Sequence, residues 1–153
     1  MTVPSALERP QGIPWRARLA ARIAVGAAFS LAVLPPRRLR TVLALLSRRA
    51  RPATYAQAKD AKDAVLAVSL ACLGVHGCLP RSLATALLCR MRGSWPTWCT
   101  GVRVRPPFGA HAWVEAEGRA VDEPTPEGYL APLITVAPRR GHQEPRGTTR
   151  PDS

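Results

Sequence analysis

A cysteine near the middle of the chain stands in a context that suits nucleophilic catalysis. Cys78 lies in the stretch GCLPRSLATALLCR, directly before the predicted first turn of a helix. Pro80 marks that turn, because a proline costs nothing where the helical N–H groups have no partner. The free N–H groups and partial positive charge of a helix start stabilise a thiolate, and Arg81 adds positive charge nearby. Cys78 is therefore the candidate nucleophile.

A histidine and two acidic residues supply the other groups that an activated thiol needs. His111 follows Cys78 by 33 residues, in the predicted strand GAHAWVEA. A hairpin turn at Glu117–Gly118 places Asp122 opposite Trp113, and therefore on the same face of the sheet as His111. A carboxylate there would hold the imidazole in its useful tautomer. Strand parity thus favours Asp122 over its neighbour Glu123 as the acid of a Cys-His-Asp/Glu triad.

The remaining cysteines and histidines are weaker candidates. Three cysteines are predicted core thiols: Cys72, Cys89 and Cys99. A metal cluster of Cys72, His76 and Cys78 would need a fourth ligand, and its spacing is irregular. His76 is alternatively a local base or a residue that lines the site, and His142 falls in the C-terminal tail. Neither a metal nor a cofactor is therefore predicted.

The composition indicates how many domains the chain can form and where its positive charge is concentrated. The 153 residues are 46% hydrophobic, which suffices for one domain with a core. The net charge of +12 comes mostly from residues 1–52, with ten Arg against one Glu. Such a segment suits nucleic acid, an anionic membrane surface, an acidic peptide partner or simply a solvated face. The apolar run Ile23–Leu34 is too short to span a bilayer and lacks a cleavage signal, so a cytoplasmic protein with reduced thiols is expected.

The spacing of apolar residues and the positions of proline and glycine predict helices in the first part of the chain and strands after them. The predicted helices cover residues 14–34, a segment that begins at Pro36, residues from a Thr54–Gln57 capping box to about 73, and residues 79–92. Short strands follow in TWCTGVRV, AHAWVEA, RAVDE and PLITVA. This order predicts an α+β fold with helices packed on a small antiparallel meander. The expected divisions are basic helices at 1–52, a catalytic core at 53–137 and a disordered tail at 138–153.

Two of these stretches together resemble a known protein family. GCLPRSLATALLCRMRG followed by TGVRVRPPFGAHAWVEAEGRAVDE is similar to the B proteins of lasso peptide biosynthesis, which are transglutaminase-like leader-peptide cysteine proteases like the C-terminal domain of the microcin-processing protein. The similarity covers about residues 52–136. It implies a papain-related fold with Cys78 as nucleophile and His111 as base. The family's acid stands about a dozen residues after the histidine, which points to Glu123 where strand parity points to Asp122, and a one-residue bulge would reconcile the two.

The resemblance also implies a substrate and partners. The substrate would be a ribosomally made precursor peptide, cleaved between leader and core, and the core would pass to an ATP-dependent cyclase resembling asparagine synthetase. Nothing in residues 1–51 resembles the leader-recognition domain that some relatives carry, so a separate leader-recognition protein is expected. Two alternatives remain: a basic module that binds nucleic acid or a membrane surface, and an amide acyltransferase that uses the same triad.

Overall fold

The computed structural model describes residues 10–139. Five helices occupy mainly the first two thirds of the chain: α1 (Trp15–Ala32), α2 (Pro36–Leu46), α3 (Tyr55–Val68), α4 (Leu70–Leu73) and α5 (Cys78–Met91). The strands are β1 (Arg51–Pro52), β2 (Ser94–Trp95), β3 (Thr97–Arg103), β4 (Gly109–Ala116), β5 (Arg119–Ala120) and β6 (Leu130–Val136). The predicted α+β class is therefore confirmed, and the pair β1–β2, which forms a parallel ladder, was not anticipated.

Local signals set most helix boundaries where they were expected. Pro36 occupies the first turn of α2, and the helix buries Leu39 and Leu43 on one face. Thr54 and Gln57 form the predicted capping box at the start of α3. Gly93 follows α5 with a φ of +86°, a conformation that glycine adopts without steric cost. These features confirm the predicted helix ends.

The third predicted helix is interrupted before Gly74. The chain leaves helical geometry at Ser69, whose side chain accepts a hydrogen bond from the Cys72 backbone N–H and so caps the short helix α4. The expectation of one helix to about residue 73 was wrong at this point. Serine competes for backbone hydrogen bonds in this way, and the interruption redirects the chain toward the start of α5.

The larger sheet has the strand order β5-β4-β3-β6, with every neighbouring pair antiparallel. The predicted hairpin joins β4 to β5 through Glu117 and Gly118, which both have positive φ. A meander would place β6 beside β5, but β6 instead crosses over and pairs with β3. Gly101 permits this pairing, because a Cβ there would overlap the carbonyl of Ala131. The prediction of a simple meander was therefore wrong in its last strand.

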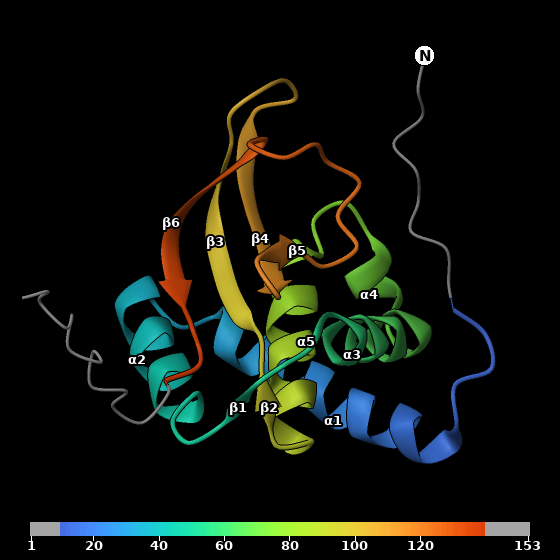
Figure 1. Ribbon diagram of the computed structural model, residues 1–153. Helices are drawn as coiled ribbons and strands as arrows, with labels where there is room; N and C mark the ends of the chain where they lie inside the picture. Colours follow the sequence, from blue (N-terminus) through green and yellow to red (C-terminus); the bar gives the residue numbers. More distant parts are fainter. Residues whose placement is uncertain (1–9, 140–153) are drawn as a thin grey trace, which may run out of the picture.

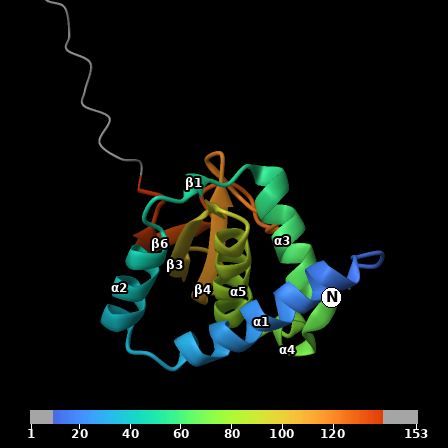
Figure 2. The same cartoon turned by 90° about the horizontal axis from the view of Figure 1, so that it is seen from below.

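The helices form a layer that positions α5 against the centre of the sheet. α5 packs on β3 and β4, with α3 beside it and α2 next to β6 (Figure 1). Seen from below, α1 crosses under α3 and α5 (Figure 2). The buried alanines of α1 belong to the same core as Leu83 and Leu88 of α5 and Trp98 of β3. The first turn of α5 is thereby held close to the inner strand β4.

Candidate active site

Cys78 is the first residue of α5, where backbone N–H groups lack helical partners. Its side chain is partly exposed, and its sulfur is hydrogen-bonded by the His111 side chain and the Ala112 backbone. Gly77, just before it, packs so closely on the preceding turn that a Cβ would overlap the carbonyl of Ala71. The Arg81 guanidinium donates to the Cys72 carbonyl at 2.8 Å and ties α5 to the same turn. These contacts place the thiol at the helix start and aim it at β4.

The four cysteines are all free thiols, and their surroundings shift the pKa of Cys78 in the opposite direction from the other three. The hydrogen bond with His111 lowers the pKa of Cys78 and, with the Ala112 backbone and nearby positive charge, outweighs burial. Burial raises the pKa of Cys72, and it raises the pKa of Cys89 to about 11 and of Cys99 to about 12. All three are buried, as predicted for core thiols. Cys78 is the cysteine whose surroundings favour the thiolate.

His111 lies on β4, only 4% exposed, between the thiol and a carboxylate. Its Nε2 is 3.0 Å from Glu123 Oε2, and its ring stacks on Trp113 with centroids 6.0 Å apart. Burial alone would lower the pKa of His111, but the hydrogen bonds to Cys78 and Glu123 together raise it. Nε2 is engaged by Glu123, and Nδ1 lies 3.1 Å from a guanidinium nitrogen of Arg103. The lowered pKa of Cys78 and the raised pKa of His111 favour a thiolate–imidazolium pair.

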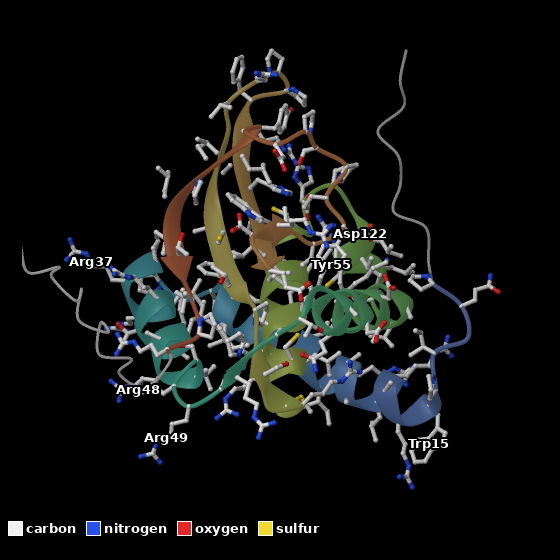
Figure 3. All side chains as sticks on the ribbon, in the orientation of Figure 1. Trp15, Arg37, Arg48, Arg49, Tyr55 and Asp122 are labelled. Atoms are coloured by element: carbon white, nitrogen blue, oxygen red, sulfur yellow. The ribbon has the colours of Figure 1, made fainter. Side chains whose placement is uncertain are left out.

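Glu123, and not Asp122, is the acid that contacts the imidazole. The β5 ladder ends at Ala120, and the backbone at Asp122 has a φ of +49°, so strand alternation no longer applies there. Asp122 turns outward beside Tyr55 (Figure 3), pairs with Lys59 at 3.6 Å and accepts no bond from His111. The choice of Asp122 from strand alternation was therefore wrong. The left-handed backbone at Asp122 acts as the bulge that brings Glu123 inward.

Lys62 on α3 completes the cluster and was missed in the sequence. Its ammonium lies 3.1 Å from Glu123 Oε1 and also donates to the carbonyls of Val121 and Asp122. Burial alone would raise the pKa of Glu123, but the His111 hydrogen bond and the Lys62 charge hold it below its usual value. A usable signal was present, because Lys62 falls on the same helical face as the buried residues Ala58 and Val65. A lysine at a core position needs a buried partner.

Two other predicted candidates do not join this cluster. His76 is exposed in the turn before α5, and His142 lies outside the described residues. Within residues 10–139, no group of three or more His, Cys, Asp and Glu side chains is placed to hold a metal ion. The described structure therefore does not bring Cys72, His76 and Cys78 together as metal ligands.

An apolar pocket of about 500 Å³ is lined by residues next in sequence to Cys78 and His111, on the opposite face of β4 from the imidazole. Leu79 and Ala110, the chain neighbours of Cys78 and His111, both line it. Its other walls come from the α1–α2 connection and from strands β3 and β6, and include Leu34, Trp98, Val102, Leu133 and Ile134. The pocket offers a surface for apolar groups, and Leu79 connects it to the start of α5.

A family model described as transglutaminase-like superfamily matches residues 21–135, which is most of the chain. The chain belongs to the transglutaminase-like superfamily. Transglutaminase-like domains commonly act as cysteine proteases or acyltransferases, and the helices packed on a small antiparallel sheet are consistent with the papain-like fold expected from the sequence. Comparison with curated proteins and with solved structures gave no match. Across residues 10–139, no helix is both long enough and apolar enough to cross a bilayer.

Proposed function

We propose that this transglutaminase-like protein is a cysteine protease that removes the leader peptide from a ribosomally made lasso peptide precursor. The observation that carries the chemistry is the continuous contact from Cys78 through His111 to Glu123. The similarity of residues 52–136 to lasso peptide B proteins supports the substrate. The apolar pocket lined by Leu79 supports a peptide substrate, because it offers a place for an apolar side chain of a bound peptide.

The geometry suits acyl transfer through a thioester. The Cys78 thiolate attacks the scissile carbonyl, and the free N–H groups at the start of α5 stabilise the resulting oxyanion. His111 gives its Nδ1 proton to the departing amine, which frees the core peptide. It then takes a proton from water, and the resulting hydroxide releases the leader as a carboxylic acid and restores the thiolate. Glu123, held ionised by Lys62, stabilises the imidazolium throughout.

Substitution of the nucleophile tests the proposal directly. Cys78→Ala should abolish cleavage in an assay reconstituted with precursor, leader-recognition protein and protease, measured by mass spectrometry of the leader and core. Cys89→Ala, near the other end of the same helix, is the matched control and should cleave, because its buried thiol has a pKa raised to about 11. Cleavage by Cys78→Ala would reject the assignment of the nucleophile.

The same thioester would also support acyl transfer to an amine. Hydroxylamine converts the thioester to a leader hydroxamate whichever acceptor is normally used, so the hydroxamate reports the intermediate and the product formed without hydroxylamine separates the two activities. A protease should yield mainly the leader acid in the absence of the added amine. A leader joined to another amine-bearing molecule under those conditions would favour the acyltransferase instead.

A further inference from the structure

The guanidinium of Arg103 lies against the catalytic imidazole. Arg103 is the last residue of β3, two residues beyond the position paired with His111, and is partly exposed. One of its terminal nitrogens is 3.1 Å from His111 Nδ1. A guanidinium can only donate, so Nδ1 accepts this hydrogen bond and the ring proton resides on Nε2, where Glu123 accepts it.

This contact conflicts with the reaction. When His111 takes the thiol proton on Nδ1, that nitrogen becomes a donor, and two donors then face each other. The positive charge of Arg103 also opposes the rise in the pKa of His111 that the hydrogen bonds to Cys78 and Glu123 produce. The guanidinium must therefore leave Nδ1 before the thiolate–imidazolium pair is fully formed.

No acidic residue of the described chain receives the guanidinium. The two carboxylates closest to the site are already engaged, Glu123 with Lys62 and Asp122 with Lys59. Arg103 itself forms no ion pair among residues 10–139. A partly exposed cation on the imidazole of the site, without a carboxylate partner among residues 10–139, is suited to an anion brought by the substrate.

We infer, building on the proposed protease function, that Arg103 binds an acidic side chain of the substrate next to the scissile amide. This contact draws the guanidinium away from His111 and frees Nδ1 to accept the proton of Cys78. The substrate class is therefore a peptide with Asp or Glu flanking the cleaved bond. Substrate binding and activation of the nucleophile are coupled through one side chain.

Two small alkylating reagents test this inference without the natural substrate. Iodoacetate carries a carboxylate beside its reactive carbon, and iodoacetamide is its neutral counterpart. Both are attacked by the thiolate at the CH₂ carbon with loss of iodide. For Cys78 of the native protein and for free cysteine, we compare the rate with iodoacetate to the rate with iodoacetamide. This rate ratio should be about ten times larger for Cys78, because a charge-assisted hydrogen bond stabilises the approach of iodoacetate.

Matched variants assign the effect to Arg103. Arg103→Gln should bring the normalised ratio close to one, whereas Arg105→Gln should retain it. Arg105 is exposed and lies two residues further on, so its loss removes the same net charge and the same long-range attraction for anions. Arg103→Lys, which keeps the charge, should give an intermediate ratio and serves as the test if Arg103→Gln does not fold.

Each result has a distinct meaning. An Arg103→Gln variant that keeps the preference, or an Arg105→Gln variant that loses it equally, overturns the inference. Native Cys78 that reacts with iodoacetamide but shows no preference for iodoacetate also overturns it, while leaving the protease proposal intact. Native Cys78 that resists both reagents overturns the proposed function itself.

Discussion

At the scale of single residues, the backbone of Asp122 determines which acid serves the site. Its φ of +49° ends the strand alternation, so Asp122 faces outward and Glu123 reaches His111. Lys62 then holds Glu123 in its ionised form. A single left-handed residue thus decides between two neighbouring carboxylates that are chemically equivalent in the sequence.

Conservative amide substitutions distinguish these two acids. Glu123→Gln should lower kcat/KM by about 10²–10⁴-fold, because the imidazolium loses its counter-charge. The Glu123 carboxylate raises the pKa of His111, so its removal lowers that pKa and shifts the alkaline limb of the pH–rate profile to lower pH. The measurement is kcat/KM across pH, or the rate of iodoacetamide alkylation where no peptide substrate is at hand.

Asp122→Asn is the matched control for this experiment. Asparagine tolerates the left-handed backbone, and the lost partner is a half-exposed lysine, so kcat/KM should stay within about twofold of the native value. A larger loss in Asp122→Asn than in Glu123→Gln would contradict the assignment of Glu123 as the acid.

At the scale of elements, the close approach of two helical turns places the nucleophile. Gly77→Ala should push the start of α5 away from Ala71 and reduce kcat/KM by about 10²-fold, since displacements of about 1 Å have that effect. Gly74→Ala is the control, because a Cβ there would lie at an ordinary 3.5 Å from the same carbonyl. Both glycines have negative φ, so the difference is one of space alone. Equal activity in the two variants would show that this contact does not position Cys78.

Some features of the fold could be predicted from the sequence and others could not. Helix starts at Pro36 and Thr54 and the turn at Glu117–Gly118 follow from local chemistry, and were predicted because neighbouring residues suffice to define them. The crossover of β6 to β3 and the pairing of β1 with β2 depend on contacts between distant segments, and no local pattern specifies such partners.

The same division applies to the candidate site. Cys78 and His111 could be named because a helix start and a strand with a histidine are visible in the sequence. The partners of Lys62 and Arg103 could not be assigned. Lys62 meets Glu123 only when α3 packs beside the loop after β5, and Arg103 meets His111 only when β3 pairs with β4. For the acid, the offset of a dozen residues was a better guide than strand parity, since parity assumes a ladder that ends at Ala120.

At the scale of the whole molecule, many of the arginine side chains lie on the surface. Arg37, Arg48 and Arg49 point into solvent at one side of the fold (Figure 3). In the ion pairs found within residues 10–139 the cation is always lysine or histidine, so no arginine described there is paired with a carboxylate. We propose that the exposed arginines of α2 dock an acidic surface of the leader-recognition protein or of the leader.

Charge reversal tests this docking surface. The triple variant Arg37→Glu, Arg38→Glu and Arg40→Glu should slow partner-dependent cleavage of the precursor by about tenfold or more, and the native rate should itself fall with added salt. Reversal of the exposed Arg16, Arg18 and Arg22 on α1 makes the same change in net charge elsewhere and should have a smaller effect. Equal losses in the two triple variants would indicate a general charge effect and remove the proposed docking surface. Both variants should alkylate normally at Cys78.

The two-residue strand β5 has a consequence for how the molecule loses activity. Cys78 and His111 belong to α5 and β4, which are held along their length by the core and by the long ladder with β3, whereas Glu123 follows a strand with only two paired positions. Segments with so few ladder bonds open locally at a lower free energy than the rest of a fold. Local opening at this short strand would therefore separate the Glu123 carboxylate from His111 before the hydrophobic interior is disrupted.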